Sequence, residues 1–204
     1  MAFSSNAAPC IISGRGLKSI NQFYNKERAR LQSFAKVYND RYTTNRIYEL
    51  TQERNNKVND FLHKASRKVV ELALINHVGT IVIGHIQGWK QKSPFRAKEN
   101  QSFVGIPFNT FFSMIEYKAA LVGIKVVIID EGYTSGTSYL DKELPCIENY
   151  NKKRRKKRGL FIADTGEKIN ADVNAAYQII KKYDESRFRF RVKHNEPITM
   201  IYVS

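Results

Sequence analysis

Two short apolar runs with a helical segment between them place the strongest constraint on how this chain can fold. Residues 80–83 and 124–129 are short and rich in β-branched side chains, which is typical of buried strands. Between them, Pro107 suits the first turn of a helix that extends to Val122. A strand, a helix and a second strand in succession form a βαβ unit, whose two strands lie parallel. The sequence therefore predicts an α/β fold.

The segment before this unit predicts a short strand hairpin followed by two long helices. Residues 2–13 read as the hairpin, and residues 17–40 as the first helix. The Thr-Thr-Asn cluster at residues 43–45 is a helix-start signal, so a second helix is expected to extend to about Asn76. Together they form a helical hairpin over residues 17–76 that carries many cations. The expected buried side of the first helix consists of Ile20, Phe23, Tyr24 and Leu31.

The charge of the chain points to a polyanionic partner. It has 34 lysines and arginines against 19 acidic residues, a net charge of +15 and an isoelectric point near 9.8. Nucleic acid is the commonest partner for such an excess, although a soluble basic protein without one has the same composition. The sharpest local signals are the cationic run at residues 152–158 and Trp89, whose ring can stack on a base or anchor its loop. The predicted nucleic-acid-binding residues are Lys18, Arg28, Trp89, Lys90, Lys152, Lys153, Arg154, Arg155, Lys156, Lys157 and Arg158.

Cysteine usage and hydropathy exclude several classes of protein. Cys10 and Cys146 stand far apart and outside any CxxC pair, which supports neither a disulfide framework nor a zinc site. No apolar run approaches the roughly 18 residues of a membrane span. The N-terminus has no basic region followed by an apolar core, so no signal peptide is visible. The expectation is a reducing, cytoplasmic location without a membrane partner.

Acidic side chains follow the second predicted strand and begin the last predicted helix. Gly84 and His85 end the first strand of the βαβ unit, and Asp130 and Glu131 end the second. The carboxyl ends of parallel strands share one edge of a sheet, where ligands collect. Asp172 begins a short helix after a predicted hairpin, so its carboxylate can reach the same edge.

Carboxylates that converge in this way can hold Mg²⁺ or Mn²⁺, because such hard cations prefer oxygen ligands. Two of these ions can clamp the attacking and leaving oxygens during phosphodiester hydrolysis. Each residue also has a simpler interpretation. Asp172 can serve only as the N-cap of its helix, Glu131 as a solvated acid at a strand end, and His85 as a satisfied structural histidine.

Six short sequence elements together carry a family resemblance. They are KSIN at 18–21, TIVIG at 80–84, WKQ at 89–91, YK at 117–118, YTS at 133–135 and DVNAA at 172–176. With these elements in this order, residues 1–183 resemble the TnpB (OrfB) family of transposon-encoded proteins, which is related to the type V CRISPR effector nucleases. The resemblance implies a RuvC-like nuclease of the ribonuclease H fold that acts as an RNA-guided DNA endonuclease with two divalent metal ions. It therefore implies DNA and a guide RNA as partners, Mg²⁺ or Mn²⁺ as the cofactor, and Asp172 as a catalytic metal ligand.

The chain departs from the family pattern at three places. Family members begin the nuclease domain with an Asp on a strand ahead of the opening hairpin, whereas Met1 stands where that hairpin starts, so the comparison implies an N-terminally truncated chain. The family's Glu at the end of the first strand is Gly84 here, and we expect Glu131 to supply that catalytic, metal-binding carboxylate. The family's zinc module has the form TSxxCxxC. Its cysteine positions are Ser138 and Asp141 here, so no zinc site is expected.

These observations predict a ribonuclease H-like (RuvC-like) mixed sheet, interrupted by the helical hairpin, over residues 1–183. A degenerate zinc-module insert is expected at 132–158 and a tail at 184–204, in which 187–192 alternates like an edge strand. We expect metal-dependent hydrolysis of DNA phosphodiesters by the intact protein and little cleavage by this chain alone. The alternatives are a non-catalytic, basic nucleic-acid-binding remnant and a decayed reading frame without function.

Overall fold

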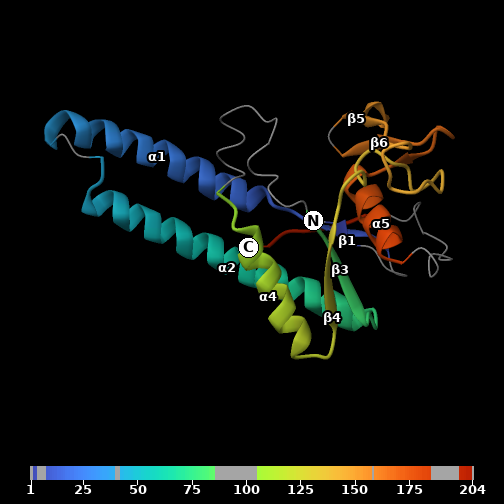
Figure 1. The fold of residues 1–204 in the computed structure, drawn as a ribbon. Helices are drawn as coiled ribbons and strands as arrows, with labels where there is room; N and C mark the ends of the chain where they lie inside the picture. The colour runs from blue at the N-terminus through green and yellow to red at the C-terminus, as the bar shows by residue number, and fades with distance from the viewer. Residues whose placement is uncertain are drawn as a thin grey trace.

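The structure is a computed structural model that describes residues 2–3, 8–39, 42–85, 105–157, 159–184 and 198–203. Within these ranges the chain forms a mixed α/β molecule, with a long helical arm on one side and a body of small sheets and shorter helices on the other (Figure 1). None of the helices in these ranges combines the length and the hydropathy needed to cross a membrane.

The arm consists of α1 (Arg15–Asn39) and α2 (Asn45–Ile75), which lie side by side (Figure 1). Thr44 is the N-cap of α2, and its side-chain oxygen accepts a hydrogen bond from the backbone N–H of Ile47 at 3.3 Å. At the other end, Nδ2 of Asn76 donates to the carbonyl of Leu72 at 2.8 Å, which satisfies one of the open carbonyls of the last turn. These are the two long helices that the sequence predicts.

The predicted βαβ unit is formed by β3 (Thr80–His85), α4 (Phe108–Ala120) and β4 (Lys125–Asp130). Its two strands are parallel and in register, from Thr80 opposite Lys125 to His85 opposite Asp130. Gly123 ends the helix with a φ of +73°, a left-handed conformation that glycine adopts without the steric cost of a side chain. The carboxyl ends of β3 and β4 therefore lie level at one edge, as the sequence predicts.

The main hydrophobic core lies where α4 packs against α2 and β4. Ile115 of α4 and Ala73 of α2 are completely buried there. Burial of a large aliphatic side chain such as Ile115 stabilises the fold by roughly 1.5–3 kcal/mol. Lys118 adds a polar link between the helices, since its Nζ donates to the carbonyl of His63 and to Oγ of Ser66, both at 2.7 Å.

A second small sheet joins segments from the two ends of the chain. β1 (Ala2–Phe3) pairs antiparallel with β2 (Cys10–Ile12), and β2 pairs parallel with β8 (Thr199–Ile201). The β1–β2 hairpin agrees with the sequence-based prediction, whereas β8 is not predicted, because three residues are too few to show an alternating pattern. The strand predicted at 187–192 lies outside the described residues.

The third sheet carries the cationic run and leads into the last helix. A short 3₁₀ helix, η1 (Lys152–Arg154), precedes β5 (Arg155–Lys157), which pairs antiparallel with β6 (Leu160–Ile162), and β6 pairs antiparallel with β7 (Lys168–Ile169). α5 (Ala171–Tyr183) follows directly and packs against β3, β1 and β6. A second core lies under α5 and consists of Ile11, Phe161, Ile169, Ala171, Val173 and Tyr177.

Two features differ from the sequence-based expectation. The described strands form three separate sheets, whereas the sequence predicts one mixed sheet. Phe23 is predicted to be buried, but 60% of it is exposed. α1 turns Leu17, Asn21 and Ala35 inward, and Phe23 lies on a different face of the helix. The prediction for Phe23 is therefore wrong, while Ile20, Tyr24 and Leu31 are partly buried.

Candidate functional site

Gly84 marks a place where β3, α5 and the end of β4 come into close contact. A Cβ atom on Gly84 would lie 2.5 Å from Cδ1 of Ile179, 2.9 Å from Cβ of Glu131 and 3.0 Å from Oε2 of Glu131. These separations are well below the roughly 3.5–4.0 Å of ordinary van der Waals contact. The side chain of Glu131 thus occupies the space that any side chain at position 84 would need.

The surroundings of Glu131 make its carboxylate harder to ionise. Partial burial raises the pKa of Glu131, nearby His85 partly offsets this, and the negative charge of Asp130 raises it again. The ring of His85 packs edge-on against Phe112 with the ring centroids 5.3 Å apart, which fits a structural histidine. An acid with a raised pKa at a strand-end edge is a candidate functional group.

Asp130, next to Glu131, contacts the C-terminal end of α5. Its Oδ2 accepts hydrogen bonds from Nζ of Lys182 at 3.0 Å and from the backbone N–H of Gly132 at 3.1 Å. The bond from Lys182 is the main reason that the pKa of Asp130 is lowered. Asp130 therefore anchors the last turn of α5 to the strand edge, and Glu131 is left as the carboxylate that covers Gly84.

Asp172 lies in the first turn of α5, but it is not the N-cap. Asn170 caps the helix, since its Oδ1 accepts hydrogen bonds from the backbone N–H groups of Asp172 at 2.9 Å and Val173 at 3.3 Å. The interpretation of Asp172 as the cap is therefore wrong by two positions. The carboxylate of Asp172 is exposed and lies 3.4 Å from Nη2 of Arg155.

One face of α5 links Asp172 with the contact at Gly84. Ala175, Ala176 and Ile179 follow Asp172 by three, four and seven positions, which places all four residues on the same side of the helix. Ile179 reaches Gly84 at one end of this face, and Asp172 stands at the other. The two residues between them are small alanines that are partly buried.

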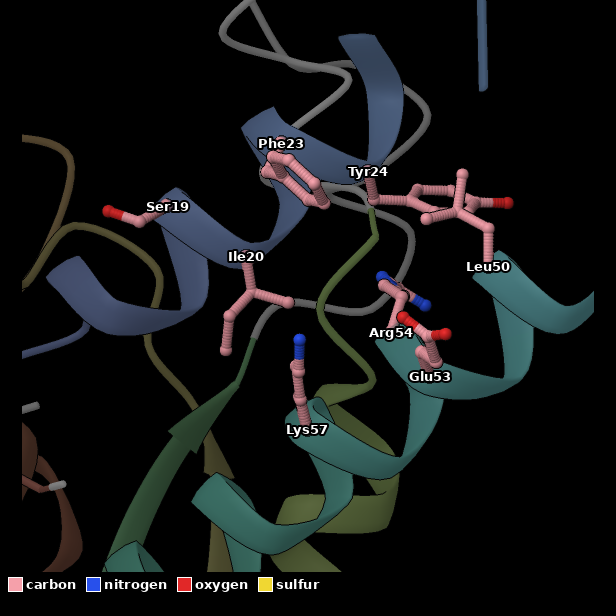
Figure 2. Close-up of a pocket in the computed structure, with 8 residues that line it drawn as sticks. All are labelled: Ser19, Ile20, Phe23, Tyr24, Leu50, Glu53, Arg54 and Lys57. Atoms are coloured by element: carbon pink, nitrogen blue, oxygen red, sulfur yellow. The ribbon is translucent and has the colours of Figure 1, made fainter. Parts of the chain in front are cut away.

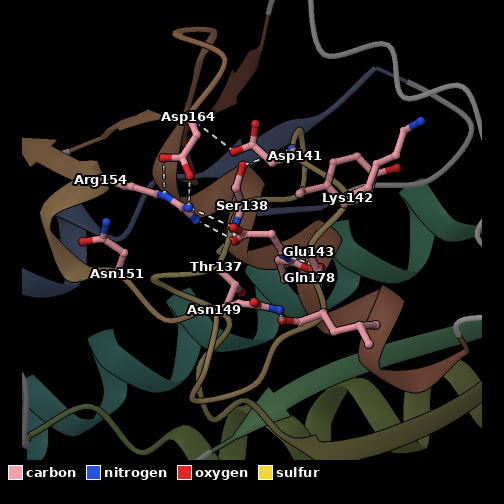
Figure 3. Close-up of polar contacts among 12 residues, drawn as sticks. Thr137, Ser138, Asp141, Lys142, Glu143, Asn149, Asn151, Arg154, Asp164 and Gln178 are labelled. Carbon is pink, nitrogen blue, oxygen red and sulfur yellow. Dashed lines mark hydrogen bonds and ion pairs between the residues drawn. The ribbon is translucent and has the colours of Figure 1, made fainter.

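Arg154 lies at the centre of an ion-pair cluster (Figure 3). Its Nη1 and Nη2 donate to the two carboxylate oxygens of Glu143 at 2.6 and 2.8 Å. Its Nε donates to Oδ1 of Asp164 at 2.9 Å, and its Nη2 also bonds Oδ2 of Asp164. Both pairings are of the strong, forked kind. The sequence groups Arg154 with phosphate-binding neighbours, but its guanidinium is buried and engaged by protein carboxylates.

Ser138 and Asp141, where the family pattern has cysteines, belong to the same cluster. The backbone N–H of Ser138 donates to Oε2 of Glu143 at 2.8 Å, and Asp141 accepts from the N–H groups of Asp164 at 2.9 Å and Thr165 at 3.4 Å. Burial alone would raise the pKa of Asp141, but hydrogen bonds with Ser138 and these two N–H groups lower it. Charge and hydrogen bonds therefore tie the insert to the β6–β7 turn.

Asp141, Glu143 and Asp164 also form the one group of three potential metal ligands that lie within 4.8 Å of one another in the described part of the chain. Arg154 already supplies positive charge between Glu143 and Asp164, so this cluster has its own cation. Glu131 and Asp172 are not members of this group.

Most of the other predicted nucleic-acid-binding residues lie on the surface. Lys152, Lys153, Arg155, Lys156 and Lys157 are exposed along η1 and β5, beside the start of α5. On the arm, Arg28 is exposed and Lys18 is half-buried. Trp89, Lys90 and Arg158 lie outside the described residues.

Two residues that shape the site are missing from the sequence-based prediction. Asn170 could have been found as the cap, because asparagine directly before a helical pattern is a start signal. Ile179 could have been found from its spacing, because residues seven positions apart share a helix face. The contact between Ile179 and Gly84 has no signal in the sequence, because it joins elements that are far apart in the chain.

The close contact at Gly84 generates the first testable prediction. Gly84→Ala should destabilise the fold by about 1–3 kcal/mol, because the new methyl group overlaps Glu131 and Ile179. Gly79→Ala is the matched control, since a Cβ atom there meets nothing within 4 Å. Urea unfolding of both variants measures the difference. Equal midpoints for the two would contradict the packing described here.

The second prediction concerns Arg154. Arg154→Gln should cost about 3–5 kcal/mol, because it leaves the carboxylate of Glu143 without its buried partner. Arg155→Gln, one residue away, should change stability by less than about 1 kcal/mol, because its pair with Asp172 is exposed. Urea unfolding reports the global effect, and hydrogen exchange at the Ser138 N–H reports local opening of the insert. Similar losses in both variants would refute the distinction.

Comparison with known proteins gives matches over most of the chain. Residues 2–90 match the family described as OrfB_IS605, probable transposase, and residues 108–179 match the family described as Cas12f1-like, TNB domain. The CRISPR-associated endodeoxyribonuclease Cas12f2 of a Micrarchaeota archaeon is 34% identical over 128 residues. That alignment covers 59% of this chain and 23% of the relative, so the matched segment spans about a quarter of the length of that protein.

Two solved structures share the fold. A Cas12f1–sgRNA–target DNA complex aligns with a TM-score of 0.55 and 22% identity, covering 77% of this chain and 40% of that one. A CRISPR-Cas12f ternary complex aligns with a TM-score of 0.63 and 20% identity, covering 91% of this chain and 35% of that one. Two family matches and one curated relative agree with the ordered sequence elements, and together they support the similarity of this chain to the TnpB (OrfB) family.

Proposed function

We propose that this chain supplies the RuvC-like part of an RNA-guided DNA endonuclease. The observation that carries the proposal is the position of Glu131. Its carboxylate fills the space over Gly84, where β3 also meets Ile179 of α5, the helix that carries Asp172 in its first turn. This is the strand end at which the family pattern has its glutamate, so Glu131 can provide that function from the neighbouring strand.

Glu131 and Asp172 are the proposed catalytic, metal-binding carboxylates. Both offer the hard oxygen donors that suit Mg²⁺ or Mn²⁺. When bound, such ions stabilise the charge that develops on phosphodiester oxygens during hydrolysis. Two contacts order the surroundings of these carboxylates: Asn170 caps the helix that bears Asp172, and Lys182 donates a hydrogen bond to Asp130, the neighbour of Glu131.

A ribonuclease H-like architecture is the fold that we propose for this part of the chain. α5 packs against both β1 and β3, so one helix covers the β1–β2–β8 sheet and the β3–β4 sheet. In this view the two sheets are parts of one layer, the arm is the inserted helical hairpin, and residues 132–158 are the remodelled zinc module. We propose residues 1–183 as the nuclease domain. β8 comes from the segment after this domain and adds a strand to the β1–β2–β8 sheet.

DNA and a guide RNA are the proposed partners. Exposed cations along β5 lie beside Asp172, where they can hold phosphates close to the proposed carboxylates. One of the two structural relatives is a complex with an sgRNA and target DNA, which supports the same pair of partners for this chain. The free thiols of Cys10 and Cys146 are consistent with the proposed cytoplasmic location.

A second candidate function is nucleic-acid binding without hydrolysis. The observation that favours it is the exposed cationic surface of β5 and α1, which does not need Glu131 or Asp172. We also propose that this chain alone cleaves DNA weakly, because the family's first-strand Asp has no counterpart among the residues assigned to the site.

Mn²⁺ binding to the full chain, measured by electron paramagnetic resonance, tests the proposed site. Glu131→Gln and Asp172→Asn should each weaken binding by roughly tenfold or more, because each removes a charged oxygen ligand. Asp130→Asn is the matched control and should have little effect, since Asp130 is paired with Lys182. Binding should also strengthen as the pH rises through the raised pKa of Glu131, because the proton and the metal compete. In Glu131→Gln that part of the pH dependence should disappear.

Unchanged Mn²⁺ affinity in Glu131→Gln would refute the assignment of Glu131. Cleavage of DNA by the wild-type chain that depends on Mn²⁺ and is lost in Asp172→Ala would contradict the expected weak activity. Salt-sensitive DNA binding whose affinity is unchanged by Mn²⁺ and by Asp172→Ala would favour the binding-only alternative.

A further inference from the structure

One side of α1 presents aromatic rings to solvent. Phe23, Phe34 and Tyr38 are 60%, 51% and 76% exposed, although rings of this size are usually buried. Lys26 and Arg30 lie between them at helical spacing, so the five residues form one row along the helix. We call this row, Phe23, Lys26, Arg30, Phe34 and Tyr38, the α1 stripe. It extends for about 22 Å.

The side chains of the stripe are arranged in mutual contact. The rings of Phe34 and Tyr38 are nearly parallel, with an interplanar angle of 17° and centroids 6.4 Å apart. The guanidinium of Arg30 lies 5.8 Å from the centre of the Phe34 ring, a cation–π distance. Near the end of the arm, Tyr42 is also exposed, with Nζ of Lys36 at 6.0 Å from its ring centre. Flat rings and cations thus share one surface.

At its other end the stripe meets a cavity between the two helices of the arm. Phe23 and Tyr24 of α1 and Leu50 of α2 contribute its apolar wall, and the cavity measures about 250 Å³ (Figure 2). Arg54 on the α2 side is held by hydrogen bonds from its Nε to Asn21 and from its Nη2 to the carbonyl of Gly105. The surface available to a ligand therefore continues from the ring row into a hollow with an apolar wall.

The charges of the arm identify the kind of partner. α1 contains six lysines and arginines and a single acid, Glu27, which pairs with Arg30 at 3.0 Å. α2 contains six cations and four acids, and three of those acids pair with cations of the same helix. The excess positive charge of the arm is thus concentrated on the helix that exposes the rings. A second copy of the chain would meet the stripe with like charge, whereas an anionic ligand would meet opposite charge.

We propose that the α1 stripe binds an unpaired stretch of nucleic acid. Its bases stack on Phe34 and Tyr38, and its phosphates are held by Lys26, Arg30 and the other cations of α1. A paired duplex keeps the faces of its bases stacked inside, so the rings add little to duplex binding. The proposal does not rest on Glu131, Asp172 or metal ions. A chain without nuclease activity would still have this surface.

The test compares unpaired and paired ligands in the presence of a chelator. Fluorescence anisotropy measures binding of the full chain to oligouridylate RNA, oligothymidylate DNA and a blunt DNA duplex, each about 12 nucleotides long. The double variant Phe34→Leu, Tyr38→Leu keeps an apolar, helix-favouring side chain at both positions and removes only the rings. We expect it to bind at least one unpaired oligonucleotide roughly tenfold or more weakly and the duplex less than about threefold more weakly. The strand type with the larger loss identifies the ligand as RNA or DNA.

Matched variants separate stacking from charge and from unspecific effects. Tyr117→Leu removes a half-exposed ring of α4 that also lies near a lysine, and it should leave all three affinities unchanged. Lys26→Gln with Arg30→Gln should flatten the salt dependence of binding, whereas the leucine variant should not. The proposal is overturned if the leucine variant binds all ligands as the wild type does. Equal losses for duplex and unpaired strands, or the same loss in Tyr117→Leu, would also overturn it.

Discussion

The contact among Gly84, Glu131 and Ile179 is the constraint on which the candidate site depends. Because β3 ends in a residue without a side chain, the end of β4 can place a carboxylate over β3, and α5 can pack close to both. A larger residue at position 84 would push away either Glu131 or α5. The same contact aligns the face of α5 that begins at Asp172. The contact therefore depends on three features together. They are the register of β3 and β4, the missing side chain at Gly84 and the direction of α5.

Positively charged side chains occur in two different settings in the cationic run. Arg154 is buried between Glu143 and Asp164, where it holds the insert to the β6–β7 turn. Its described neighbours in the same run, Lys152, Lys153 and residues 155–157, are exposed. Removal of a buried ion partner is costly, whereas an exposed pair contributes little. One cationic run thus combines a buried structural residue with exposed residues that we propose to bind phosphates.

The sequence predicts the local elements well and the contacts between distant elements poorly. The spacing of apolar residues predicts the parallel β3–β4 pair and both arm helices, and a capping signal predicts the start of α2 at Thr44. Phe23 is misplaced because it lies on a different face of α1 from the residues that turn inward, and the apolar pattern alone does not distinguish the two faces. The role of Arg154 depends on acids ten and eleven residues away, for which no spacing rule exists. The nearness of Glu131 to Gly84 was expected from strand order, but the close contact with Ile179 required the fold.

The most direct test of this account is a crystal structure of the full chain soaked with Mn²⁺, with the ion located by its anomalous scattering. The account predicts Mn²⁺ in direct contact with carboxylate oxygens of Glu131 and Asp172, with Arg154 still bound between Glu143 and Asp164. Mn²⁺ found only among Asp141, Glu143 and Asp164, with the Arg154 guanidinium displaced, would contradict it. So would Mn²⁺ that contacts neither Glu131 nor Asp172.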